Sequence, residues 1–99
     1  MEFELEFTPD AWAHLQEFSV RDRKLILDAI NTQLRYEPDV ETRNRKPMKD
    51  NLLATWELRV GKFRVFYDID NDRVKIVYIL AIGYKDHNHL FIGGKRFDL

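Results

Sequence analysis

The residues from Trp56 to Ile69 read WELRVGKFRVFYDI, and the prediction of the fold starts from their pattern. Apolar and polar side chains alternate over residues 55–60 and again over residues 63–69. A period of two is typical of a strand with one buried and one exposed face. Gly61 and Lys62 separate the two runs and can form a tight turn. The stretch therefore predicts an antiparallel β-hairpin.

The segments on either side of this hairpin predict one more strand after it, and a strand and two helices before it. Residues 73–83 contain an almost unbroken apolar run, which is typical of a central strand covered by helices. Glutamates alternate with large apolar residues over 2–7, which indicates an N-terminal strand. Thr8-Pro9-Asp10 is a helix start, and Asp22 can cap a second helix. We expect a helical hairpin over about residues 9–37.

Two segments lack a periodic pattern. Residues 37–51 contain two prolines and almost nothing that could be buried, so we expect an exposed loop. The residues after Gly83 are interpreted as a polar and aromatic tail. Together these patterns predict one α+β domain over residues 1–99. We expect a small, mostly antiparallel sheet with an N-terminal strand and a helical hairpin packed on one face.

The composition restricts the class of protein. The chain has 99 residues, 44% of them hydrophobic, and a net charge of −1, which suits a single folded domain. The sequence contains no cysteine, so disulfides, thiolate zinc sites and thiol nucleophiles are excluded. The first residues are acidic where a secretory signal is basic, and the apolar stretches are shorter than the ~20 residues that span a bilayer. We expect a cytoplasmic protein without membrane contact.

The charges are distributed unevenly along the chain. Residues 41–64 carry seven basic and three acidic side chains. Guanidinium groups bind phosphate oxygens in pairs and lysines act as point charges, so such a group can form a phosphate-binding groove. A solvated loop, or pairing of Arg59 and Arg64 with the N-terminal glutamates, would also account for these charges. The basic residues are Arg43, Arg45, Lys46, Lys49, Arg59, Lys62 and Arg64.

The histidines differ in what they suggest. His87 and His89 follow the predicted central strand, and an imidazole there can exchange a proton with a ribose hydroxyl or a leaving oxygen. Asp86 is a possible third metal ligand, but no established metal-binding spacing is present, so we expect neither a metal nor a cofactor. His14 lies in the first predicted helix, where we expect a partly exposed residue without a functional role.

The hairpin and the later run Ile79 to Asp86, ILAIGYKD, are similar to a known family. The pattern L-R-V-G-x-[FY]-R-V-x-Y, followed by an apolar strand ending in I-G-x-[KR], resembles the RelE/ParE toxin superfamily of bacterial type II toxin–antitoxin systems. The resemblance covers nearly the whole chain. It implies a toxin that is held by a cognate antitoxin protein.

The resemblance implies two possible activities. RelE-like members are ribonucleases that cut messenger RNA in the ribosomal A site, whereas ParE-like members inhibit DNA gyrase. The basic residues favour the first activity, a metal-independent endoribonuclease that inhibits translation with the ribosome and mRNA as partners. The alternative is a ParE-like gyrase inhibitor without nuclease activity.

The RelE-like pattern also implies roles for individual residues. It places loop lysines at Lys46 and Lys49, and a basic residue after I-G-x at Lys85. A tyrosine in the tail of some members falls near Phe91, which can stack on a base but cannot transfer a proton; His87 or His89 can. We therefore expect the catalytic residues to be Arg59, Arg64, Lys85 and His87. The expected RNA-binding residues are Arg43, Arg45, Lys46, Lys49, Lys62 and Phe91.

Overall fold

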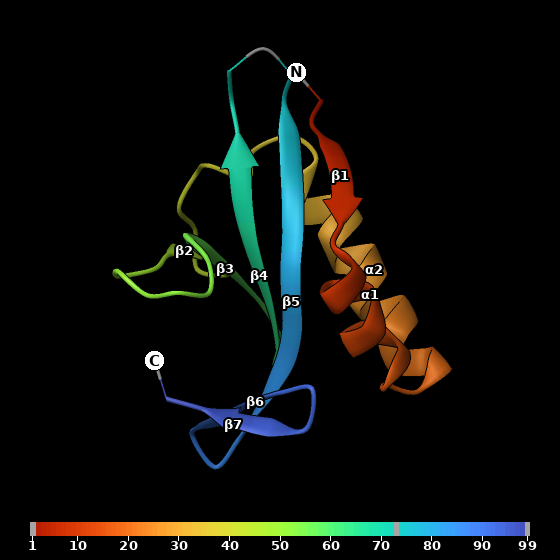
Figure 1. The fold of residues 1–99 in the computed structure, drawn as a ribbon. Helices are drawn as coiled ribbons and strands as arrows, with labels where there is room; N and C mark the ends of the chain where they lie inside the picture. Colours follow the sequence, from red (N-terminus) through yellow and green to blue (C-terminus); the bar gives the residue numbers. More distant parts are fainter. Residues whose placement is uncertain (1, 73, 99) are drawn as a thin grey trace.

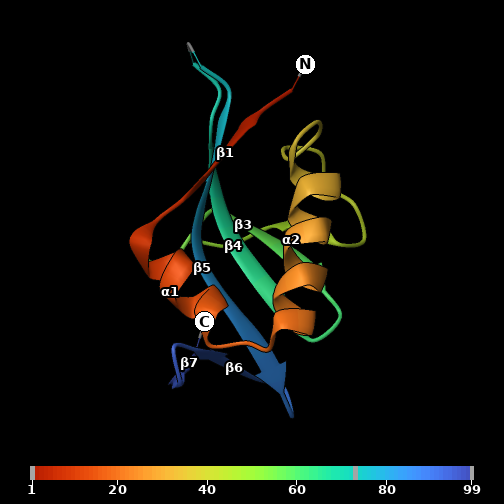
Figure 2. The same cartoon turned by 90° about the vertical axis from the view of Figure 1, so that its right-hand side faces the viewer.

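The computed structural model describes residues 2–72 and 74–98 and contains two layers, a sheet and a pair of helices (Figure 1). In chain order the elements are β1 (Glu4–Phe7), α1 (Pro9–Gln16), α2 (Val20–Leu34), β2 (Arg45–Pro47), β3 (Trp56–Val60), β4 (Phe63–Asp70), β5 (Ile76–Asp86), β6 (His89–Ile92) and β7 (Lys95–Phe97). Figure 2 shows both helices on the same side of the sheet, with α1 packed over β5 and α2 over β3. The predicted fold class is confirmed.

The sheet is organised around β5. Its order is β2-β3-β4-β5-β6-β7, with antiparallel neighbours, and β1 pairs with β5 in parallel. One edge of β5 serves two partners, because β1 pairs with it up to Ile79 and β6 pairs with it from Gly83 onward. Three residues of β5, 80–82, therefore lie between the two partner strands.

Side chains of the first helical segment bridge this interval. The Thr8 hydroxyl accepts a hydrogen bond from the Ala11 amide at 3.1 Å and donates one to the Leu80 carbonyl at 3.2 Å. His14 Nδ1 accepts a hydrogen bond from the Ile82 amide at 3.3 Å. The helix cap and His14 thus replace strand hydrogen bonds in the interval. His14 is partly exposed, as expected, and this hydrogen bond gives it a structural role in holding α1 on β5.

The core lies between the helices and the sheet. Ser19, rather than the predicted Asp22, caps α2, and it accepts a hydrogen bond from the Asp22 amide at 3.1 Å. Asp22 lies in the first turn of α2, where its negative charge interacts favourably with the helix dipole. Fully buried side chains of this layer include Leu15, Ile26, Ile30, Leu34, Val65, Tyr67 and Ile79. A second, smaller apolar cluster lies on the other face and consists of Ala54, Phe66, Ala81, Leu90 and Ile92.

The structure corrects the predicted loop over 37–51. This segment contains the short strand β2, which pairs with β3. It also buries Pro38, whose carbonyl accepts a hydrogen bond from the Tyr67 hydroxyl at 2.8 Å. Burial raises the pKa of Tyr67 above its usual value. The segment is therefore anchored in the fold at two points.

The predicted C-terminal tail is also corrected. β5 continues to Asp86, and the tail folds into β6 and β7. The first turn passes through His87 and Asn88, which adopt φ angles of 51° and 68°. Such left-handed angles usually fall on glycine, and because no glycine lies at this turn, the residues did not indicate a tight hairpin. Glu4 and Glu6 lie on β1, which does not neighbour β3 or β4, and Glu2 lies 3.5 Å from Arg35, so these glutamates do not pair with Arg59 or Arg64. No helix within the described residues is long and apolar enough to cross a membrane.

Replacing Gly83 with alanine should lower the free energy of unfolding by about 3 kcal/mol or more. A Cβ at this position would collide with the Phe91 carbonyl oxygen and lie 2.8 Å from Ile92 Cγ1, so β6 could not keep its place. Gly94→Ala is the matched control, because a Cβ there meets nothing within 4 Å. The control should lose only the ~1–2 kcal/mol of its left-handed backbone. If urea unfolding showed the same loss of unfolding free energy for both variants, the close approach of β6 to Gly83 would be contradicted.

Replacing His14 with phenylalanine should destabilise the protein by about 1–3 kcal/mol, because the Ile82 amide loses its acceptor while the ring volume is retained. His89→Phe, at an exposed position on β6, is the control and should change the free energy of unfolding by less than about 0.5 kcal/mol. A His14→Phe protein as stable as the parent would show that the hydrogen bond to β5 contributes nothing.

Candidate functional site

The strand register brings most of the predicted basic residues to the sheet face opposite the helices. Arg59 lies directly opposite Arg64, and Arg64 lies opposite Gly83 on β5. Lys46 is paired with Glu57, which is two residues before Arg59 and therefore on the same face. Lys85 is two residues beyond Gly83. We call the set of Lys46, Lys49, Arg59, Arg64 and Lys85 the cationic face.

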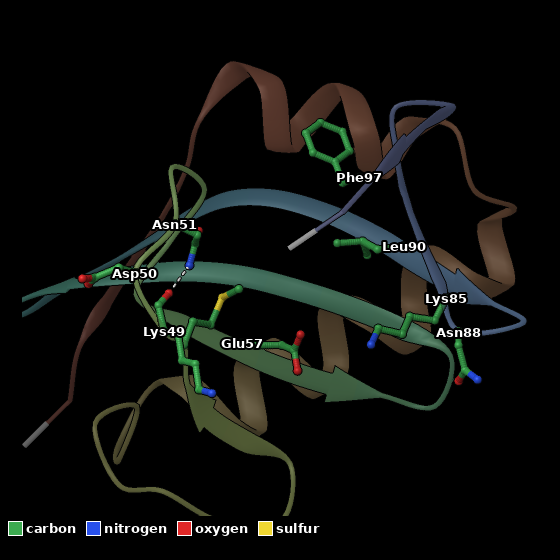
Figure 3. Close-up of a pocket in the computed structure, with 9 residues that line it drawn as sticks. Lys49, Asp50, Asn51, Glu57, Lys85, Asn88, Leu90 and Phe97 are labelled. Carbon is green, nitrogen blue, oxygen red and sulfur yellow. Dashed lines mark hydrogen bonds between the residues drawn. The ribbon is translucent and has the colours of Figure 1, made fainter.

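A cleft of about 280 Å³ opens on this face between the loop after β2 and the β5–β6 turn. Figure 3 shows Lys49 and Lys85 on opposite sides of the cleft, with Glu57 between them. Leu90 and Phe97 form another wall. The remaining lining residues are Met48, Asp50, Asn51 and Asn88.

Glu57 is the central acidic group of the cleft, and the sequence reasoning missed it. Only 8% of the residue is exposed. Its carboxylate accepts a hydrogen bond from Arg59 Nε at 2.8 Å. A buried carboxylate needs such a partner, and here the partner is one of the predicted catalytic residues. The signal for this pair was the two-residue spacing, which places Glu57 and Arg59 on one face of the predicted strand.

Arg59 and Arg64 are held in different ways. The Arg59 side chain is 47% exposed, so its guanidinium is oriented by Glu57 and still reaches solvent. Arg64 Nη1 donates hydrogen bonds to the carbonyls of Gly61, at 2.7 Å, and Phe63, at 2.9 Å. Burial lowers the pKa of Arg64, with a smaller lowering from Arg59 and an opposing effect of Glu57. The two guanidinium groups therefore form a fixed pair of like charges.

The lysines of the cationic face differ in their partners. Lys46 Nζ lies 3.4 Å from a carboxylate oxygen of Glu41, whereas Lys49 and Lys85 form no ion pair within residues 2–72 and 74–98. The loop that carries Lys49 is braced by Asn51, whose side-chain amide makes four hydrogen bonds to backbone groups. Two cations on opposite sides of the cleft are thus available to an anion.

His87 does not line the cleft, although its neighbour in the β5–β6 turn does. It occupies the left-handed turn next to Asn88, which lines the cleft. Its Nδ1 is 2.8 Å from Asp86 Oδ1, and its side chain is 91% exposed. When Nδ1 donates to this carboxylate, Nε2 is the nitrogen that can accept a proton. Within the described residues, no three acidic or histidine side chains are grouped so as to hold a metal ion.

Four of the predicted RNA-binding residues lie outside the cationic face. Arg45 neighbours Lys46 on β2 but points to the opposite face, where its guanidinium donates to the carbonyls of Val40, at 3.0 Å, and Gln33, at 2.9 Å. Phe91 stacks on Tyr84 with ring centroids 5.4 Å apart. Lys62 lies over the rings of Phe63 and Tyr84. Arg43 is exposed in the loop before β2. Because side chains alternate between the two faces of a strand, Arg45 and Phe91 lie on the opposite face from their sequence neighbours Lys46 and Leu90.

Replacing Arg45 with methionine should lower the free energy of unfolding by about 1–3 kcal/mol, because the part-buried hydrogen bonds to the carbonyls of Val40 and Gln33 are lost. Arg43→Met removes the same charge from an exposed position and should change the free energy of unfolding by less than about 0.5 kcal/mol. Urea unfolding of the two variants measures the difference. If both variants were as stable as the parent, Arg45 would have no structural role.

Comparisons with known proteins agree with this architecture. A family model described as the ParE toxin of type II toxin–antitoxin system, parDE, matches residues 5–88. A chain of the crystal structure of the toxin–antitoxin complex RelBE2 from Mycobacterium tuberculosis is 27% identical, with a TM-score of 0.73. The match covers 86% of this chain and 100% of that chain. A search of curated proteins found no match. Because the family model spans most of the chain, this protein belongs to the ParE toxin family, within the RelE/ParE superfamily of type II toxin–antitoxin systems.

Proposed function

We propose that this toxin is a ribosome-dependent mRNA endoribonuclease whose cationic face holds the scissile phosphate. One observation carries the proposal: Arg59 and Arg64 lie directly opposite each other beside a cleft that has Lys49 on one side and Lys85 on the other. Like charges on paired strands are destabilising, so this arrangement is favourable only near an anion. Glu57 supplies one negative charge, and a phosphodiester supplies another.

The proposed reaction uses the 2′-hydroxyl of the messenger as nucleophile. Its oxygen attacks the adjacent phosphorus, the bond from phosphorus to the 5′-oxygen breaks, and the products are a 2′,3′-cyclic phosphate and a 5′-hydroxyl. Charge builds up on the phosphorane oxygens, where fixed cations act most strongly. Arg59, positioned by Glu57, and Arg64 supply this charge, and Lys46 and Lys49 position the strand.

Two proton transfers complete the reaction. His87 can take the proton of the 2′-hydroxyl through Nε2, because Asp86 lies against its other ring nitrogen. Lys85 is an ammonium donor that lines the cleft and can protonate the leaving 5′-oxygen. The chain's own side chains therefore supply every charge and proton that the reaction requires.

The proposed partner that controls the toxin is a cognate antitoxin. The structural match is to a chain of a toxin–antitoxin complex, which supports such a partner. The cationic face favours an acidic antitoxin segment that orders on docking, because opposite charges steer the encounter and offset part of the ordering entropy. A segment bound there would exclude RNA from the cleft.

Arg59→Gln should reduce the rate of messenger cleavage about 100-fold in a cell-free translation reaction, because one oriented charge on the transition state is lost. The protein should remain folded, since Arg59 is half exposed. Arg21→Gln, on α2 in the other layer, is the charge-matched control and should cleave at the parent's rate. Full activity of a folded Arg59→Gln protein would remove Arg59 from the mechanism.

The second candidate function is inhibition of DNA gyrase, and the ParE family model over residues 5–88 favours it. The same purified protein can be assayed for gyrase supercoiling and for messenger cleavage with and without ribosomes. Cleavage that requires ribosomes supports the ribonuclease. Intact messenger together with inhibited supercoiling would contradict the ribonuclease and support the gyrase inhibitor.

A further inference from the structure

An aromatic side chain at the edge of the sheet lies in line with the cationic cleft. The register joins Lys85 on β5, Leu90 on β6 and Phe97 on β7 in one row, so the three side chains share a face. Leu90 is 5% exposed, whereas Phe97 is 38% exposed. Figure 3 shows the Phe97 ring at the cleft wall, beyond Leu90 as seen from Lys85. The edge strand thus presents a flat apolar surface next to the lysines of the cleft.

We infer that Phe97 is a stacking platform for one nucleobase of single-stranded RNA, next to the phosphate held by the cationic face. The inference rests on the proposed ribonuclease function. A nucleotide contains a planar base with apolar faces next to an anionic phosphate. The cleft offers a matching pair of features, an apolar ring beside cationic side chains. Stacking on aromatic side chains is the usual way in which proteins hold unpaired bases.

The same geometry excludes Phe91, which the sequence suggested for this role. Phe91 is opposite Tyr84 in the register and stacks on it with an interplanar angle of 18°. Tyr84 packs against the helix-side core, so both rings are on the face away from the cleft. One residue of alternation separates Phe91 from Leu90, and only the Leu90 side of the strand faces the phosphate site.

The space next to Phe97 is large enough to accept the base and has mainly apolar walls. A second hollow on the same face is lined by Phe97, Leu52 and Leu53, together with Asp50, Asn51 and Asp98. It shares Asp50, Asn51 and Phe97 with the cleft, so the two hollows adjoin. The Asn51 amide is already used by four hydrogen bonds within its loop. A base in this space is held by contacts with its flat faces, and stacking of this kind does not discriminate between the four bases.

The test uses ribosomes programmed with short synthetic messengers and single-turnover cleavage over a range of toxin concentrations. Phe97→Leu should raise the half-saturating concentration about tenfold and change the maximal rate less. Phe97→Trp keeps a stacking ring and should behave like the parent. Phe91→Leu, which changes an aromatic residue on the other face, should also bind like the parent.

A second measurement connects the effect to a base. Messengers with an abasic nucleotide at each position of the codon in turn are compared. At one of these positions, the abasic nucleotide should weaken binding to the parent and to Phe97→Trp about tenfold. The same abasic substitution should cause no further loss for Phe97→Leu, because the two changes remove one contact. If the penalties added, or if Phe97→Leu bound like the parent, the subsite would be wrong while the ribonuclease function stood. A parent protein that cleaves no messenger would overturn the proposed function and the subsite with it.

Discussion

One edge of β5 is shared between two strands, and the positions of the helices and of the cleft follow from this sharing. β1 occupies this edge up to Ile79 and leads directly into α1, so the helices must pack on the face that β1 delivers them to. β6 occupies the edge from Gly83, which has no side chain to obstruct the Phe91 backbone. The interval between them would expose unpaired backbone groups, and Thr8 and His14 satisfy them instead. The helices are thus kept on one face, and β6 and β7 form part of the wall of the cleft on the other.

That division of the faces separates two uses of charge. On the helix face, Arg45 is 8% exposed and satisfies carbonyls of α2 and the following loop, so it behaves as part of the core. On the other face, the neighbouring Lys46 and the cleft lysines remain accessible. Residues that are adjacent in the sequence therefore have opposite roles, and a count of charges along the chain does not distinguish them. The distinction follows only from which face each side chain takes in the sheet.

The sequence was informative wherever a regular period extended over enough residues. The hairpin around Gly61, the central strand and the two helices were predicted because apolar residues repeat at strand or helix spacing, and each is present. β2 was missed because it has three residues and its buried side chain is an arginine. β6 and β7 were missed because the turn at His87 and Asn88 uses left-handed angles without glycine. The grouping of Arg59, Arg64 and the lysines was predicted, but Glu57 was not, since its role depends on burial.

Repulsion between the like charges of the cationic face lowers the stability of the protein, and interactions within the fold offset only part of this cost. Like charges at directly opposite positions of paired strands are destabilising. Arg59 and Arg64 lie opposite each other, and burial and this neighbour both lower the pKa of Arg64. Glu57 compensates for part of the repulsion by pairing with Arg59, and hydrogen bonds to Gly61 and Phe63 fix Arg64. The guanidinium groups are therefore oriented before any ligand arrives, and an incoming phosphate gains attraction without reorganising them. The repulsion that lowers the stability of the free protein is relieved when an anion binds, so its relief adds to the binding free energy.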